Sequence, residues 1–405
     1  MTTKRKGVNH TSLKIQNQML LIQEIKHAKG MSRAEAAKKL GLSAPSVSSN
    51  IEDLIDRGII TEKGIGESNG GRKPIVLEYN YEYGYVIGLA LKTDVLSGVI
   101  SNLAGEIQYR LDIKEDLTTF VEEELFNIIQ KSIDQMLRSS SIDRKYVKCI
   151  VLSLPGIISD NNIQVSNIFP VMKGNHLFQF LKDTYATYVM IKNDINTEAV
   201  GEYWKLQDKN LKNIIYISAQ KEGIGSGIII DGCLYEGSRY GAGEIGYMLL
   251  NTEFLRDKKA DHAQDYFERV LSHKKILKYA FDLAMEKGGY IKTVTQGNFC
   301  DMNMEIFKGA LEQEDKVALE TLDIVARYYT ALIHNMSVIL NPEMVILSGF
   351  IREFGSVFTK AITKYVHNIS IIPIDIRFSQ LGDMVELYGC MYFGIEYVHK
   401  NILFI

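Results

Sequence analysis

The chain has 405 residues, of which 46% are hydrophobic and 23% are charged, and its formal net charge is −3 at pH 7. This composition excludes disordered and collagen-like chains, and the length predicts two or three folded domains. The sequence contains no apolar run long enough to span a bilayer and begins without an apolar leader, so we expect a cytoplasmic protein that does not enter a membrane.

Charge is distributed unevenly along the chain. Residues 1–80 carry 13 Lys/Arg and 8 Asp/Glu, a local charge of +5, whereas the rest carries 33 and 41, a local charge of −8. A basic start joined to an acidic remainder is typical of a small DNA-binding module fused to a larger domain that does not bind polyanions. The four cysteines are widely separated, which predicts neither a disulfide framework nor a zinc site made of neighbouring cysteines.

The first predicted elements are three helices. Apolar residues recur at helical spacing over 13–27, and a second helix over 33–40 begins at Ser32, which forms a capping box with Glu35. After a turn at Gly41, Ser43 caps a third helix that runs to about residue 57. This order predicts a helix–turn–helix unit, although an ordinary helical hairpin would show the same pattern.

The third helix is the candidate for insertion into the major groove of DNA. One of its faces is apolar, and we expect the other to present small hydroxyl and amide side chains that can meet phosphates or base edges. The predicted DNA contacts of the helix pair are Ser32, Arg33, Ser43, Ala44, Ser46, Ser48, Ser49 and Asn50.

A wing is predicted directly after the third helix. Two short apolar strands flank a Gly70-Gly71 turn that holds Arg72 and Lys73 at its tip. A flexible turn with cations at its tip is what contact with phosphates or with the minor groove needs, although a solvated turn would also carry them. The wing closes a predicted DNA-binding domain over residues 1–80.

The remainder of the chain repeats one pattern. A strand over 85–91 is followed by a polar turn and two more strands, and the same succession of strands and turns recurs from residue 213. The repeat predicts two similar α/β lobes that face a cleft. Ligands bind such sheets at the carboxyl ends of strands, where 193–194, 223–227 and 348–349 fall.

Two of these loops, and a third that contains Glu244, carry residues suited to chemistry. Asn193 and Asp194 could bind sugar hydroxyls, but Asp and Asn also cap helices routinely. The glycine-rich segment 223–227 could hold phosphates through backbone N–H groups, or it could be a hairpin turn. Glu244, between two glycines, suits hydrogen bonding to a polyol, and a solvated loop carboxylate is the alternative.

Motifs along nearly the whole chain resemble those of the ROK (repressor, open reading frame, kinase) family, particularly its xylose-operon-repressor-like branch. No single motif is specific, but together they are. The matching segments are 32–37, 41–43, 68 with 70–74, 103–107, 193–196, 201–202, 223–227, 231–235, 241–246, 341–342 and 348–349.

This resemblance implies an α/β chain in which an N-terminal winged helix–turn–helix precedes a two-lobed, actin-like (ribonuclease-H-like) domain of the sugar-kinase type over residues 81–405. It implies a transcriptional regulator, most simply a repressor, whose partners are double-stranded operator DNA and a small-molecule sugar effector. Members of the family form homodimers or tetramers, so the same is expected here.

The main alternative is a sugar kinase with an appended DNA-binding head. Kinases of the family carry a motif that resembles Asp-x-Gly-x-Thr in the first hairpin. At the matching positions this chain has Ala90 in place of the Asp and Lys92 in place of the glycine. Alanine cannot organise a metal ion, and lysine places a side chain where backbone should approach phosphate, so we predict no catalytic residues and no enzyme activity. A third possibility is a repressor whose pocket no longer binds a sugar.

The resemblance also assigns the effector site. Family members carry a cysteine-rich zinc cluster with a histidine, but here Tyr247 stands at the histidine position and no cysteine occurs between Cys233 and Cys300, so we predict no metal and no cofactor. Glu268 matches a sugar-contacting glutamate, and Asn167 resembles an asparagine of the sugar pocket. The predicted effector-binding residues are Asn167, Asn193, Asp194, Glu244, Tyr247 and Glu268.

Overall fold

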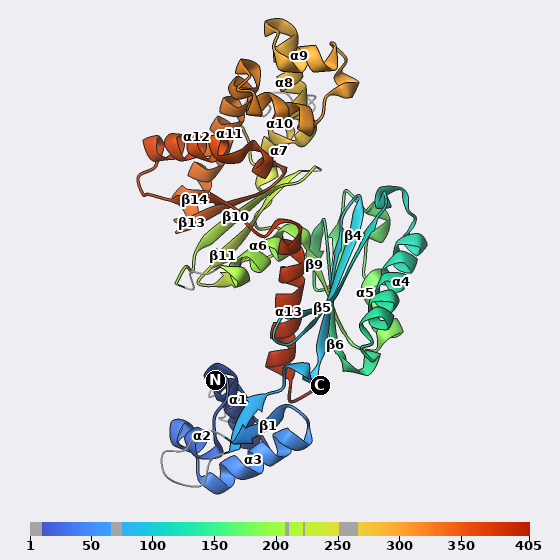
Figure 1. The fold of residues 1–405 in the computed structure, drawn as a ribbon, viewed down its shortest axis with the longest axis vertical. Coiled ribbons are helices and arrows are strands. Elements are labelled where there is room, and N and C mark those ends of the chain that lie inside the picture. Colours follow the sequence, from blue (N-terminus) through green and yellow to red (C-terminus); the bar gives the residue numbers. More distant parts are fainter. Residues whose placement is uncertain (1–9, 66–74, 207–209, 222, 251–265) are drawn as a thin grey trace, which may run out of the picture.

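A small head and two α/β lobes make up the computed structural model, which describes residues 10–65, 75–206, 210–221, 223–250 and 266–405. The head lies at one end, one lobe lies at the other, and the first lobe sits beside the long helix that joins them (Figure 1). The amino- and carboxyl-terminal parts of the described chain lie close together at the head, because the last helix returns to it (Figure 1).

The head is a winged helix–turn–helix, as predicted. It comprises α1 (His10–Ala28), α2 (Arg33–Leu40), α3 (Ala44–Asp56), β1 (Ile60–Ile65) and β2 (Ile75–Tyr79). The Ser32–Glu35 capping box is formed, and Ser43 caps α3 by accepting a hydrogen bond from the Ser46 N–H. The strands β1 and β2 pair antiparallel. The predicted wing tip with Arg72 and Lys73 lies outside the described residues.

The first lobe is built on a five-stranded sheet in the order β5-β4-β3-β6-β9, in which β3 is antiparallel to β4 and parallel to β6. Helices α4 and α5 cover its outer face (Figure 1). The elements are β3 (Tyr85–Leu91), β4 (Val95–Asn102), β5 (Ile107–Lys114), α4 (Glu122–Ser140), β6 (Val147–Leu154), the hairpin β7 (Ile157–Ser159) and β8 (Asn162–Val165), α5 (His176–Tyr185) and β9 (Tyr188–Asn193).

The second lobe repeats this topology, which confirms the predicted internal repeat. Its sheet has the order β12-β11-β10-β13-β14, with β10 antiparallel to β11 and parallel to β13. The strands are β10 (Ile214–Ala219), β11 (Ile224–Ile230), β12 (Cys233–Leu234), β13 (Met344–Gly349) and β14 (Asp375–Phe378). The helices are α7 (Phe267–Leu271), α8 (His273–Lys287), α9 (Tyr290–Thr295), α10 (Met304–Glu312), α11 (Lys316–Leu340) and α12 (Gly355–Ile369).

Two helices, α6 (Asp194–Lys205) and α13 (Val385–Asn401), cross at the junction of the lobes (Figure 1). Glycines make the crossing close: a Cβ on Gly201 would lie 2.0 Å from the Val385 carbonyl oxygen, and one on Gly389 would lie 1.9 Å from that of Thr197. No side chain fits there, so the two helix backbones are in direct contact.

Most of the glycine-rich segment 223–227 is strand, and Gly223 lies in the hairpin turn between β10 and β11, so the hairpin alternative is correct in part and phosphate binding stays a prediction. Residues from Ile224 onward belong to β11. A Cβ on Gly225 would lie 2.5 Å from the Ile195 side chain, and one on Gly227 would lie 2.2 Å from the Ala199 Cβ. The glycines are needed because α6 packs directly on this strand.

Candidate functional site

A cavity of about 270 Å³ lies between the two lobes. Its walls come from the carboxyl end of β9, the hairpin β7–β8, the turn after β3, the turn between β10 and β11, the strand β11, and the segment that leads to α7. All the predicted effector-binding residues line it, namely Asn167, Asn193, Asp194, Glu244, Tyr247 and Glu268. Segments separated by about a hundred residues in sequence therefore meet here, although their role in binding stays a prediction.

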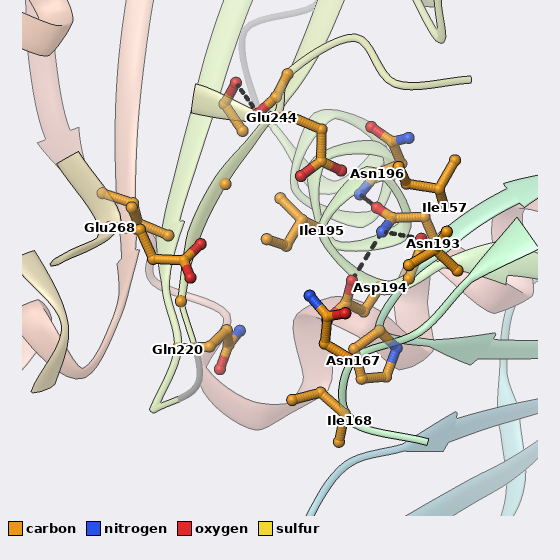
Figure 2. Close-up of a pocket in the computed structure, with 18 of the residues that line it drawn as sticks. Ile157, Asn167, Ile168, Asn193, Asp194, Ile195, Asn196, Gln220, Glu244 and Glu268 are labelled. Carbon is orange, nitrogen blue, oxygen red and sulfur yellow. Dashed lines mark hydrogen bonds between the residues drawn. The ribbon is translucent and has the colours of Figure 1, made fainter. Parts of the chain in front are cut away.

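Asn193 and Asp194 have different roles at the start of α6. The Asn193 side chain is the N-cap, since its Oδ1 accepts the Asn196 N–H at 2.8 Å. Its Nδ2 donates to the Gly156 carbonyl at 2.9 Å and to Asp194 Oδ1 at 3.0 Å. The capping alternative is thus correct for Asn193, while Asp194 is left with its carboxylate toward the cavity (Figure 2).

An ion cluster adjoins Asp194 at the inner end of the cavity. Lys92 Nζ lies 3.1 Å from Glu386 Oε2 and 3.5 Å from Glu198 Oε1, and both carboxylates are buried. Burial lowers the pKa of Lys92, but the charges of Glu386 and Glu198 outweigh it and raise that pKa above its ordinary value. Burial, followed by the charges of Glu386 and Glu198, raises the pKa of Asp194 to about 8.

The opposite part of the cavity gathers two more carboxylates. Glu244 and Glu268 both point into the open space (Figure 2). Burial raises the pKa of each, and for Glu244 the charge of Glu268 adds to the effect. Tyr247, which is 49% exposed, has its pKa raised by burial and by the two carboxylates. These groups can accept hydrogen bonds from a polyhydroxylated ligand, and in their protonated forms they can also donate.

Glycine lets Glu268 approach the strand wall. A Cβ on Gly246 would lie 2.9 Å from Glu268 Oε2, and one on Gly223 would lie 3.1 Å from the same atom. The backbone around α7 and β11 is therefore shaped to hold this carboxylate at the cavity surface. This favours a functional role for Glu268 over that of a solvated side chain.

Several cavity residues were missed by the sequence analysis. Gln220 follows β10 and donates from Nε2 to Glu198 Oε1 at 2.9 Å, and Lys92 lines the cavity as well. The carboxyl-end rule for strands would have identified Gln220. Glu386 has one sequence signal, a carboxylate inside an apolar helix pattern, but nothing in the sequence pairs it with Lys92.

Contacts across the rim hold the lobes together beside the cavity. Lys221 Nζ lies 2.7 Å from Asp94 Oδ2, and the Tyr240 hydroxyl donates to Asp160 Oδ1 at 3.1 Å. Each contact joins the second lobe to the first. The structure therefore has a cleft that is bridged at its edge while its interior stays open.

The predicted DNA contacts divide into exposed and buried groups. Ser43, Ala44 and Ser49 are exposed around α3, and Ser46 and Ser48 are half-buried. Together they place small polar side chains on the accessible side of the helix and at its amino end, where a phosphate is also favoured by the helix dipole.

Three predicted contacts are engaged within the head. Asn50 is 6% exposed and its Nδ2 donates to the Ser46 carbonyl at 2.8 Å, so the prediction that it lies on the accessible face is wrong. Ser32 is also 6% exposed, because its hydroxyl serves the capping box. Arg33 is half-buried and pairs with Glu62 of β1 at 2.8 Å. These side chains shape the head rather than face a groove in this structure.

Within the described ranges, no group of three or more His, Cys, Asp or Glu side chains could hold a metal ion, and none of the helices has the length and apolarity needed to cross a membrane. Segment 251–265, which includes His262, lies outside these ranges. The prediction that the chain has no zinc therefore stays a prediction.

Two family models match the chain. One described as ROK family covers residues 86–395, and one described as winged helix-turn-helix DNA-binding covers residues 16–61. The chain is 28% identical over 393 residues to the xylose repressor of Caldicellulosiruptor bescii, a match that covers 95% of this chain and 96% of that protein.

Solved structures show the same fold. A ROK family transcriptional regulator, described as a homolog of the Escherichia coli Mlc protein, superposes with a TM-score of 0.77 at 19% identity and covers 96% of this chain and 98% of its own. A ROK family glucokinase from Streptomyces griseus, in complex with glucose and AMPPNP, has a TM-score of 0.63 at 20% identity. The match covers 76% of this chain and 99% of the glucokinase chain. At these identities the likeness shows the fold alone.

Proposed function

The chain belongs to the ROK family, and from this premise we propose that it is a sequence-specific DNA-binding transcriptional repressor whose ROK domain binds a sugar or a sugar derivative. The observation that carries the proposal is the presence, in one chain, of a winged helix with an accessible α3 and of a cavity that gathers the predicted effector residues. Residues 1–80 would read the DNA and residues 81–405 would hold the effector.

The donor set favours a polyhydroxylated ligand without a phosphate. Asp194, Glu244 and Glu268 place three carboxyl groups in the cavity, and a phosphate beside them would meet like charge wherever they are ionised. Hydroxyl groups can donate to these oxygens, and Gln220 and Asn167 supply amides for further hydrogen bonds. Because a relative is named as a xylose repressor, D-xylose is the first sugar to test.

The competing function, a sugar kinase with a DNA-binding head, is disfavoured by the first hairpin. Ala90, at the position of the kinase Asp, is 2% exposed and packs in the core. Lys92 is paired with two buried carboxylates where the kinase pattern has glycine. Phosphoryl transfer needs a metal and backbone groups beside the phosphate, and these residues supply neither.

Two heads would be required for a palindromic operator, because each winged helix reads one half-site. We therefore propose that the chain works as a homodimer or a tetramer. Sedimentation of the purified protein, alone and with DNA, tests this: a species that stays monomeric on its DNA would contradict it.

A pair of binding measurements tests the function. The chain should select one duplex sequence from a random pool, and a sugar from a panel that starts with D-xylose should raise its Tm and alter the affinity for that duplex. In a coupled assay with ATP, Mg²⁺ and the same panel, no turnover is expected. Turnover with any sugar would establish the kinase instead, and failure to select DNA would remove the repressor function.

A further inference from the structure

One helix connects the cavity to the DNA-binding head. Helix α13 begins beside the cavity, where Glu386 meets Lys92, and it ends against the head (Figure 1). A helix of this length spans about 25 Å at 1.5 Å per residue. The described chain therefore holds a single rigid element that contacts both of the proposed binding regions.

The cavity end of α13 is bound into a buried polar network. Lys92, which lines the cavity, pairs with Glu386 on α13 and with Glu198 on α6. Glu198 also accepts hydrogen bonds from the Tyr216 hydroxyl at 3.2 Å and from Gln220, another cavity residue, at 2.9 Å. A ligand that bonds to Gln220 or Asp194 would compete for the partners of this network, so its binding energy would differ between two arrangements of the network.

The helices that carry Glu198 and Glu386 are packed tightly on each other. Helices α6 and α13 are in backbone contact at Gly201 and Gly389, and a Cβ at either position would overlap the other helix. Glu198 lies one turn after Asp194 on α6, so displacement at the cavity is passed to the crossing rather than absorbed by side chains.

The far end of α13 is fastened to the head by several contacts. The Nζ atom of Lys26, on α1, lies 2.7 Å from His399 Nδ1. Arg57, which directly follows α3, donates a hydrogen bond to the Ile402 carbonyl at 3.2 Å. Val398 and Ile402 are fully buried in the same apolar core as residues of α1 and α3. The head is thus fastened to α13 by polar contacts, of which Lys26 makes one, and by this apolar core.

We propose that α13 couples the cavity to the DNA-binding head and that Lys92 is the positioning residue through which cavity occupancy is sensed. This inference rests on the proposed function. It assigns to Lys92 a part in the response to the effector and none in reading DNA. The alternative is that the ion pair of Lys92 with Glu386 only stabilises the fold. In that case substitutions of the pair would have no selective effect on the sugar-induced change in DNA affinity.

Three variants test the coupling. Lys92→Met and Glu386→Gln alter the cavity end, and Lys26→Met alters the head end. Lys287→Met is the matched control, because Lys287 pairs with Glu320 at 2.7 Å on the surface of the second lobe. Each protein is titrated with the duplex that the wild-type chain selects from a random pool, with and without D-xylose or the panel sugar that raises the wild-type Tm most.

The wild type and the control should show the same sugar-induced change in DNA affinity, of about 5- to 150-fold. In the three variants this ratio should fall toward one. Binding of the sugar alone and of the DNA alone should stay close to wild type in Glu386→Gln and Lys26→Met, because neither residue lines the cavity. Glu386→Gln keeps the test decisive if Lys92→Met does not fold. A wild-type ratio in all three variants, or in Lys26→Met alone, would overturn coupling through α13.

The same data separate this inference from the proposed function. If the wild-type chain selects no duplex or binds no sugar, the proposed function fails and the inference falls with it. If the wild type responds to the sugar and the variants respond equally, only the inference fails, and the proposed function stands.

Discussion

A Cβ added to Gly227 of β11 would lie 2.2 Å from the Ala199 Cβ of α6. The helix that carries Asp194 therefore packs on the sheet of the second lobe at a distance that only glycine permits. Because Ala199 itself is fully buried, neither partner can move into solvent to make room. The position of the cavity carboxylate depends on this contact.

We predict that Gly227→Ala forces α6 away from β11, with a loss of about 1–3 kcal/mol in the free energy of unfolding, as is usual for overpacking. Sugar affinity should fall as well, since Asp194 is displaced with its helix. Urea unfolding and sugar titration measure the two effects. Gly241→Ala is the control, because no atom lies within 4 Å of a Cβ there. Equal stabilities of the two variants would contradict the close-packing argument.

The raised pKa of Asp194 predicts how stability depends on pH. Its pKa is raised to about 8 by burial and by Glu386 and Glu198, with Lys92 acting in the opposite direction. The folded chain keeps this proton where the unfolded chain has lost it. The contribution of the group to stability is therefore complete below about pH 4, the unfolded pKa, and is lost as the pH rises through about 8.

Asp194→Asn removes this pH-dependent loss. Relative to the wild type, the variant should gain Tm at pH 8 and gain little at pH 4, because both side chains are neutral in the folded state at low pH. Melting curves at the two pH values measure the difference. Asp282→Asn, which alters an exposed carboxylate on α8, is the control and should change Tm little at either pH, because exposed ion pairs contribute little to stability. A uniform shift in Asp194→Asn would argue against the raised pKa.

Local signals were enough for much of the fold. The second helix has the predicted bounds, residues 33–40, because its capping box and its C-terminal glycine lie within ten residues of one another. The strand over 85–91 was also predicted with its bounds, since a run of buried side chains marks a strand with both faces covered. The repeat of the two lobes followed from the same kind of pattern.

The incorrect expectations concern side-chain contacts that the residue pattern does not determine. A glycine in a turn and a glycine under a packed helix look alike in sequence, so the pattern over 223–227 does not reveal that α6 packs on Gly225 and Gly227. Asn50 was assigned to the accessible face of α3, but its side chain turns back to its own helix. The ion pair between Lys92 and Glu386 joins residues almost three hundred positions apart, and no local sequence pattern predicts it.

The wing prediction concerns affinity and its dependence on salt. Arg72→Ala should weaken binding to the selected duplex and reduce the magnitude of the salt slope by about 0.9 if one phosphate contact is lost. Sugar binding should be unchanged, because the cavity is formed by other segments. Anisotropy titrations at several salt concentrations measure both, with Lys287→Ala as the control. An unaltered affinity and slope would remove Arg72 from the DNA interface.

Asn193 and Asp194 allow the capping and binding roles to be separated. Asn193 is the N-cap of α6, so Asn193→Ala should cost about 1 kcal/mol of stability, and Asn193→Ser, which retains a capping oxygen, should cost less. Asp194 is the first helical residue and is not the cap, so Asp194→Ala should leave the cap intact. It should abolish the response of DNA binding to the sugar while leaving the affinity for DNA alone unchanged.

Urea unfolding measures the cost to the cap, and DNA titrations with and without the sugar measure the response. Asn193→Ala should lose the stability of the cap, whereas Asp194→Ala should lose the response to the sugar without that loss. If Asp194→Ala responds to the sugar as the wild type does, Asp194 is not a ligand of the effector. Its carboxylate would then be a source of repulsion beside Glu198 and Glu386 that the fold tolerates for another reason.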